Sequence, residues 1–247
     1  MYKEMSLWEH IVELRYRLIV CLIFVGIGIV VSFPFSKDVF GFLELPCKGI
    51  IHNFVFFSPQ DAFLVYLRIS ILTGLVISLP VIMFQVWEFI APAMERKTQK
   101  YIVIFVLFAT LLFLAGMAFI FLLVLPAGLK FLLLLGGTQL TPMISAASYI
   151  SFVVGTLIAG GIIFQMPVLS FFLTKFGMLN WKFLTGKIRY AIVGIFIVAA
   201  ILAPSPDMFS MFMMAIPMFF LYGVSLLVSF IANPKSGNTN VEILQNT

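Results

Sequence analysis

Charged side chains are scarce in this sequence. They make up 10% of its 247 residues, whereas 62% are hydrophobic and 29 are Phe. A soluble domain of this length is typically about half apolar and about a quarter charged. A soluble core cannot cover so much apolar surface, so the composition excludes a soluble protein and predicts an integral membrane protein.

Acidic residues are missing from the apolar runs. All 10 Asp and Glu residues lie at or outside the end of a predicted span, and Gln165 in "GGIIFQMP" is the only strongly polar side chain well inside one. Ion-coupled carriers need titratable or charged groups within the membrane. The sequence therefore argues against such a carrier.

Clusters of metal-binding or catalytic residue types are missing as well. His10 and His52 are predicted on opposite sides of the membrane, and no nucleophile is paired with a base. Cys21 lies in an apolar run and Cys47 in a loop, so a disulfide between them is not expected. The sequence predicts a protein that is not an enzyme and that holds no metal or other cofactor.

Six apolar runs are candidate membrane-spanning helices. They cover about residues 18–36, 63–86, 102–125, 149–174, 189–204 and 208–231. The sequence predicts one all-α membrane domain over residues 1–232. The polar tail 233–247 is expected to be disordered.

Lys and Arg are divided unevenly between the two sides of these spans. The side of the termini holds Lys3, Arg15, Arg17, Arg96, Lys97, Lys100, Lys175, Lys182, Lys187, Arg189 and Lys235, whereas the other holds Lys37, Lys48, Arg68 and Lys130. Cytoplasmic loops carry the excess of basic residues, so both termini are predicted to be cytoplasmic. The basic residues lie at helix ends rather than in one stripe, so no nucleic acid is expected as a partner.

The fifth span is short. Residues 191–203 supply only 13 apolar positions, roughly 20 Å of helix against a hydrocarbon core of about 30 Å. This span must thin the bilayer or recruit its polar flanks into the crossing. A re-entrant hairpin is the alternative.

Several stretches resemble the TatC family, the large membrane subunit of the twin-arginine protein translocase. They are "HIVELRYRL" (10–18), "SLPVIMFQVWEFIAPAM" (78–94), "GMAFIFLLVLP" (116–126), "PSPDMFS" (204–210) and "AIPMFFLY" (215–222). The resemblance implies six tilted helices in a concave bowl or glove, in the cytoplasmic (inner) membrane. It also implies a receptor that binds the paired arginines of signal peptides on folded cargo and recruits single-span partner subunits.

Glu9 and Glu13 are four residues apart, as are Glu13 and Arg17, so a helix would place them on one face. One interpretation is an interfacial helix whose charges only solvate and orient the first span. The other is an anionic patch that captures guanidinium groups, because carboxylate–guanidinium pairs are strong and directional. The resemblance favours Glu13 as the signal-peptide contact, with Arg15 ordering the patch.

The family's second signal-binding carboxylate falls on Thr98 in this sequence. Glu95, about one helical turn earlier, is the predicted substitute, and Glu88 is a weaker candidate. Alternatively, Glu95 is a solvated partner of the nearby Arg96 or Lys100.

Four further residues are candidates for partner contacts or translocation. Gln165 stands where the family usually has a membrane-embedded Glu, and the alternative for it is an amide bridge between helices beside the Pro167 kink. Asp207 either caps the sixth span or acts in translocation. Pro80 is expected to kink the second span, and Phe63 is expected to pack in the outer cap.

The resemblance therefore implies a translocase receptor subunit. Its expected partners are twin-arginine signal peptides, single-span subunits of the TatA/TatB type and the lipid bilayer, and a homo-oligomer within a hetero-complex is expected. The alternatives are a small-molecule transporter, for which no inverted repeat or midplane polar site is visible, and a structural or inactivated scaffold.

Overall fold

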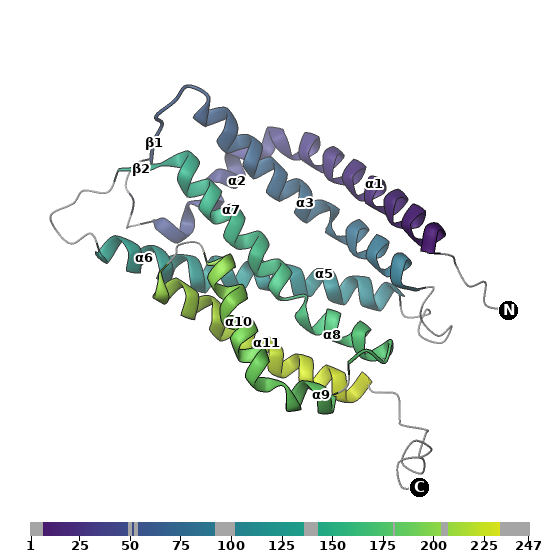
Figure 1. Cartoon of the computed structure of the whole chain (residues 1–247). Coiled ribbons are helices and arrows are strands. Elements are labelled where there is room, and N and C mark those ends of the chain that lie inside the picture. Colours follow the sequence, from purple (N-terminus) through teal and green to yellow (C-terminus); the bar gives the residue numbers. More distant parts are fainter. Residues whose placement is uncertain are drawn as a thin grey trace, which may run out of the picture.

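The computed structural model describes residues 7–48, 51, 54–91, 102–135, 143–179, 181–203 and 207–232, most of which are helical (Figure 1). Among these residues, five apolar helical segments are long enough to cross a membrane, and a sixth apolar helix is shorter. The prediction of an all-α protein with six apolar spans is therefore confirmed. The tail 233–247 lies outside the described residues.

The helices follow one another along the chain in the order of the predicted spans. They are α1 (Leu7–Ser32), the 3-10 turn η1 (Phe33–Phe35), α2 (Ser36–Leu43), the 3-10 turn η2 (Leu45–Cys47), α3 (Asp61–Ile90), α5 (Ile102–Phe119), the π-helical η4 (Ile120–Val124), α6 (Leu125–Leu135), α7 (Ala146–Ile163), α8 (Met166–Lys175), α9 (Trp181–Gly186), α10 (Ile188–Leu202) and α11 (Met208–Ala232).

The first helix begins earlier than predicted. α1 starts at Leu7 rather than near residue 18, so the charged stretch "EHIVELRYRL" is part of the helix itself. Hydropathy marks the residues that face lipid, whereas a helix can continue into the interface where charged side chains are solvated or paired. The charges are consequently held in helical register with the apolar part of α1.

Two other spans also differ from the prediction. The third passes through η4 and continues past residue 125 in α6, to Leu135. The fourth is divided into α7 and α8 at Phe164 and Gln165. Pro167 lies in the first turn of α8, where a missing N–H is tolerated, so the break is located where the proline predicted a kink.

Two short strands were not predicted. β1 (Phe54–Val55) pairs in parallel with β2 (Ile144–Ser145), and the strands directly precede the turn into α3 and the start of α7. The hydroxyl of Tyr149 donates a hydrogen bond of 2.7 Å to the carbonyl of Leu43. The strands and this bond tie α2 and α7 together at one end of the molecule, the strand end (Figure 1).

Close approach of helices depends on glycine pairs. A Cβ on Gly28 of α1 would lie 2.7 Å from the carbonyl oxygen of Gly74 of α3, and a Cβ on Gly116 of α5 would lie 2.6 Å from that of Gly160 of α7. Small residues allow backbones to approach in this way within a membrane. Ser78 adds a hydrogen bond of 2.9 Å to the carbonyl of Phe24, so α3 is joined firmly to α1.

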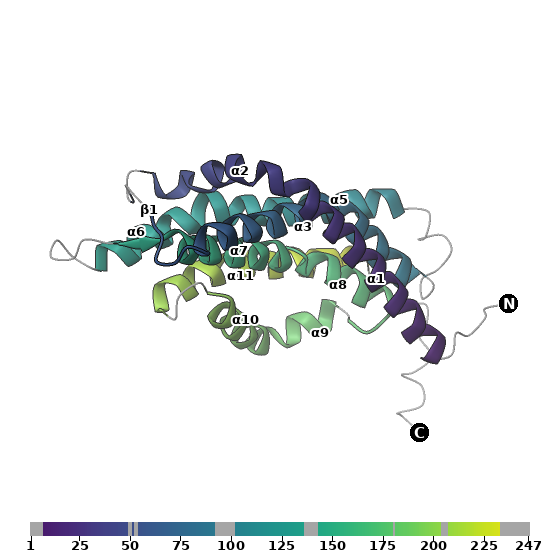
Figure 2. The ribbon, with the colours of Figure 1, turned by 90° about the horizontal axis from the view of Figure 1, so that it is seen from above.

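The layer of helices is curved. Figure 2 shows α10 on one side of the layer that contains α3, α7 and α11, and α1 crossing this layer obliquely, so that the first turns of α1 lie on the same side as α10. The start of α1, the end of α3, the start of α5 and the end of α11 lie together at the end opposite the strands, which we call the Leu7 end (Figure 1). This arrangement agrees with the expected bowl or glove.

The shortness of the fifth span is confirmed. α10 has 15 residues, about 22 Å of helix. α9 lies directly before it, and the hydroxyl of Tyr222 in α11 donates a hydrogen bond of 2.8 Å to the carbonyl of Leu184 in α9. The more polar α9 is thereby held next to α11 and extends the path of α10 toward the Leu7 end.

Candidate functional site

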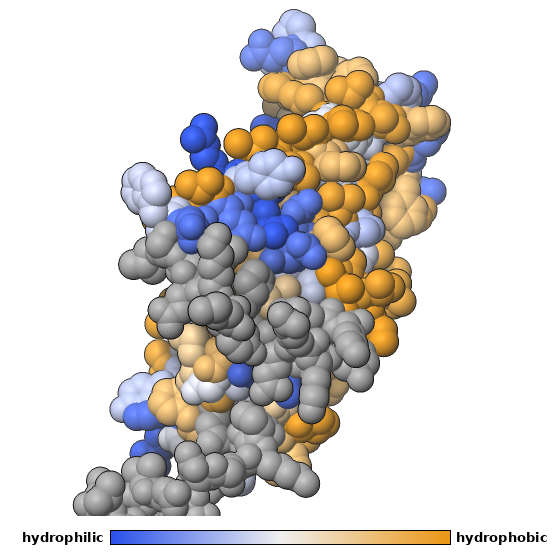
Figure 3. Space-filling model, turned by 90° about the vertical axis from the view of Figure 1, so that its right-hand side faces the viewer, coloured by the Kyte–Doolittle hydropathy of each residue, from blue (hydrophilic) through white to orange (hydrophobic). Residues whose placement is uncertain are grey.

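The charged first turns of α1 lie against the last turns of α3 at the Leu7 end. The ring of His10 stacks on Phe89, with centroids 4.3 Å apart and an interplanar angle of 24°. Figure 3 looks at this end of the molecule and shows, near the centre of the view, a group of hydrophilic side chains with apolar side chains beside it. The close packing of α1 on α3 therefore assembles a polar site from two helices that are distant in sequence.

The centre of this site is the guanidinium group of Arg17. Its Nε and Nη2 donate to Oε1 of Glu13, at 3.0 Å and 2.5 Å. Its Nη1 donates to Oε1 of Gln85 at 3.2 Å, and Nη2 forms an ion pair of 3.4 Å with Oε2 of Glu88. Three acceptor side chains from two helices thus converge on one guanidinium group, and the predicted Glu13–Arg17 pairing is present.

Glu13 is only partly satisfied by this arrangement. Its second oxygen, Oε2, is buried and has no hydrogen-bond partner among the described residues. The side chains of Glu13 and Arg17 are each 17% exposed, whereas that of Glu88 is 40% exposed. The site therefore has a shielded carboxylate with an unused acceptor and a second carboxylate that is open to solvent.

The other predicted signal-peptide residues have different positions. Arg15 is exposed on α1, and no ion pair joins it to another described residue. Glu9 is exposed one turn before Glu13. Glu95 and Thr98 lie outside the described residues, so a role of Glu95 stays a prediction.

Glu88 and Gln85 matter more than the sequence suggested. The sequence indicates Glu88 only as a weaker candidate and does not single out Gln85. Both are polar residues three positions apart in the otherwise apolar "FQVWEFIA" (84–91), so helical spacing places them on one face of α3. Two polar residues one helical turn apart at the end of a predicted span are the signal that could have identified them.

Gln165 forms a bridge between helices. Its Nε2 donates a hydrogen bond of 3.1 Å to the carbonyl of Ala109, which connects the α7–α8 break to α5. This is the amide bridge that the sequence left open as an alternative. A role of Gln165 in partner docking stays a prediction.

The remaining candidates have structural contacts of their own. Oδ1 of Asp207 accepts a hydrogen bond of 2.7 Å from the backbone N–H of Ser210, so Asp207 caps the start of α11. Pro80 lies inside α3 and exposes its ring, and its missing N–H removes one helical hydrogen bond there. Phe63 is 57% exposed, and its ring centroid is 6.2 Å from that of Phe33.

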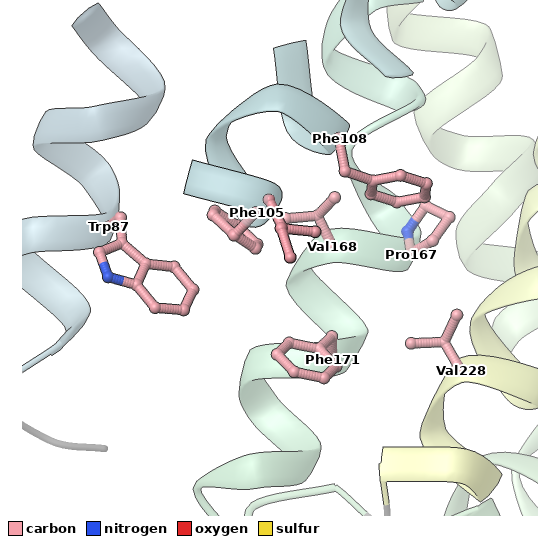
Figure 4. Close-up of a pocket in the computed structure, with 8 residues that line it drawn as sticks. Trp87, Phe105, Phe108, Pro167, Val168, Phe171 and Val228 are labelled. Atoms are coloured by element: carbon pink, nitrogen blue, oxygen red, sulfur yellow. The ribbon is translucent and has the colours of Figure 1, made fainter. Parts of the chain in front are cut away.

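An apolar pocket of about 330 Å³ lies beside the site, between α3, α5, α8 and α11 (Figure 4). Trp87, the neighbour of Glu88 in α3, lines it together with Phe105, Phe171 and Val228. The ring of Trp87 contacts that of Phe105, with centroids 4.6 Å apart. The last turns of α3 thus carry the polar residues on one face and part of an apolar pocket on another.

Comparison with known proteins gives one consistent result. The family model described as "Sec-independent protein translocase protein (TatC)" matches residues 9–217. The protein of that name from Aquifex aeolicus is 39% identical over 238 residues, which are 94% of this chain and 97% of the relative. That from Carboxydothermus hydrogenoformans is 34% identical over 233 residues, 94% of this chain and 96% of the relative.

Solved structures agree with the sequence comparison. A crystal structure described as that of the twin arginine translocase receptor TatC superposes with a TM-score of 0.80 at 38% sequence identity. The similarity covers 91% of this chain and 99% of the other. The same receptor in DDM also gives a TM-score of 0.80.

Proposed function

This chain belongs to the TatC family, and from that membership we propose that it is the receptor subunit of a twin-arginine protein translocase. In this role it binds the Arg-Arg signal peptide of folded cargo and recruits single-span subunits for export. The apolar helices and the match to the family model over residues 9–217 support this role. The site of recognition, the partners and the orientation are parts of the proposal.

The observation that carries the proposal is the set of acceptors around Arg17. Glu13, Gln85 and Glu88 present oxygen atoms to every nitrogen of one guanidinium group. Arginine is suited to such recognition because its planar, permanently charged fork offers several donors at once, whereas lysine offers a compact point charge. We assign Glu13 and Glu88 as the carboxylates that bind the signal, with Glu9 and Arg15 at the margin and Glu95 as a further candidate.

We place the protein in the cytoplasmic (inner) membrane with the Leu7 end toward the cytoplasm. The distribution of Lys and Arg supports this orientation, and the ends of α1 and α11 at the Leu7 end agree with it (Figure 1). In this orientation the Arg17 site faces the compartment where folded cargo is made.

The proposal is tested with photo-crosslinkable signal peptides. We expect a peptide with Arg-Arg to label the receptor in membranes at least about tenfold more than one with Lys-Lys, because lysine cannot use the three converging acceptors. Equal labelling of the receptor by both peptides would contradict the receptor function and would favour the alternative of a structural scaffold. A transporter would bind neither peptide.

The second part of the proposal is the recruitment of partners. The protein recruits single-span subunits of the TatA/TatB type into a hetero-complex that contains more than one copy of this chain. Gln165 is its candidate residue, because it is the strongly polar residue at the interior α7–α8 break. We expect Gln165→Ala to reduce the amount of partner that co-purifies by about threefold, the loss of roughly one hydrogen bond between helices. Gln60→Ala, an exposed glutamine before α3, is the matched control, and equal recovery of partner with both variants would contradict the assignment.

A further inference from the structure

We propose that Arg17 is a specificity-determining residue: its guanidinium group occupies the signal site in the empty receptor, and an arginine of the signal peptide must take its place. The inference rests on the proposed receptor function. It concerns how the site selects two arginines rather than one.

Arg17 fills the position of a ligand. All of its nitrogen atoms donate to side-chain oxygens, and those oxygens come from α1 and α3. A peptide arginine that approached the same acceptors would meet the same donors already in place. In the empty receptor Glu13 is therefore already paired with Arg17. Binding of the signal peptide exchanges one guanidinium group for another.

The resident pair does not use the site fully. Both Nε and Nη2 of Arg17 donate to the same oxygen of Glu13, while the other oxygen is buried and unpartnered among the described residues. The strongest carboxylate–guanidinium pairs use two parallel hydrogen bonds to the two oxygens. Arg17 is attached four residues along the same helix, which limits how it can approach Glu13. A peptide arginine has no such attachment and can reach the bidentate geometry.

The exchange explains a requirement for two arginines. Glu13 and Glu88 both contact Nη2 of Arg17, at 2.5 Å and 3.4 Å. When Arg17 leaves, Glu13 and Glu88 both lose their partner, and an unpaired charge is unfavourable above all at the shielded Glu13. One incoming arginine that takes the bidentate geometry on the two oxygens of Glu13 leaves Glu88 without its partner. Two adjacent arginines restore partners to both, so Arg17 converts a preference for positive charge into a preference for a pair.

The test measures binding of three synthetic signal peptides, with Arg-Arg, Arg-Lys and Lys-Lys, to purified full-length receptor. In the Arg17→Gln variant we expect the Arg-Lys peptide to bind about tenfold more tightly than to the wild type, because no resident guanidinium has to be displaced. The ratio between Arg-Arg and Arg-Lys affinities should fall by a similar factor. Arg189→Gln, which removes an exposed arginine from α10, is the matched control and should leave both values unchanged.

A second variant covers the case in which Arg17→Gln does not fold. Arg17→Lys keeps the positive charge but lacks the planar fork, so it holds the acceptors less well than arginine does. We expect the Arg-Lys peptide to bind this variant a few-fold more tightly than it binds the wild type. If the folded Arg17 variants bind each of the three peptides with the same affinity as the wild type, or with a lower affinity, Arg17 only supports the structure and the inference is wrong. If the wild type does not distinguish Arg-Arg from Lys-Lys, the receptor function itself fails, which is a different result.

Discussion

A Glu13→Lys protein is expected to bind an Arg-Arg signal peptide at least about a hundredfold more weakly than the wild type. The substitution removes the shielded carboxylate at the centre of the site and places a second cation beside Arg17. Removing one partner of a largely buried ion pair typically costs 3–5 kcal/mol, and a loss of about 3 kcal/mol is already more than a hundredfold in affinity. Titration of purified receptor with a fluorescent signal peptide measures this loss.

The matched control for this prediction is Asp38→Lys. Asp38 is an exposed acid on α2, near the strand end, and its reversal changes the net charge of the protein by the same amount. We expect its affinity to stay within about twofold of the wild type. Wild-type affinity in a folded Glu13→Lys protein would refute the assignment of the site. Equal losses in both variants would mean that net charge, rather than Glu13, attracts the peptide.

The second large effect is expected at the contact between α1 and α3. In a Gly74→Ala protein the new Cβ would lie 2.5 Å from the backbone nitrogen of Ile29 and 2.8 Å from the carbonyl carbon of Gly28. Backbone atoms cannot turn aside as a flexible side chain can, so the two helices must separate. Overpacking of this kind costs about 1–3 kcal/mol. Thermal unfolding in detergent should show the loss, and Arg-Arg peptide affinity should fall with it because this contact positions the acceptors Gln85 and Glu88 of α3 next to Glu13 of α1.

Gly26→Ala provides the matched control for the packing prediction. Gly26 lies in the same helix as Gly28, and a Cβ built there meets no atom within 4 Å. Because alanine favours a helix over glycine, we expect this variant to be at least as stable as the wild type. Equal destabilisation by the two substitutions would show that helix propensity, and not the close approach, decides stability here.

The sequence could predict the parts of this structure that depend on local spacing. Four residues separate Glu13 from Arg17, and one turn of helix is enough to bring them together. The shortness of α10 followed from a count of apolar residues. The polar Gln165 and the nearby Pro167 indicated where the fourth span is interrupted.

The parts that depend on how helices pack could not be predicted in this way. Gln85 and Glu88 reach Arg17 across 68 and 71 residues of chain, and no periodicity within either helix specifies the register between them. That register depends on the fit of Gly28 against Gly74, which is visible only in three dimensions. β1 and β2 have two residues each, too few to give an alternating pattern, and they pair from distant loops.

The location of the Arg17 site within one helix pair has a consequence for biogenesis. Glu13, Arg17, Gln85 and Glu88 all belong to α1 and α3, the first two long helices to leave the ribosome. Chain synthesis proceeds at roughly 5–20 residues per second, and early segments can associate before later ones exist. The nascent hairpin of α1 and α3 therefore carries the complete set of acceptors before α7 to α11 have been translated. Its resident arginine provides a partner for those acceptors during that interval, when the rest of the helical layer is not yet there to shield them.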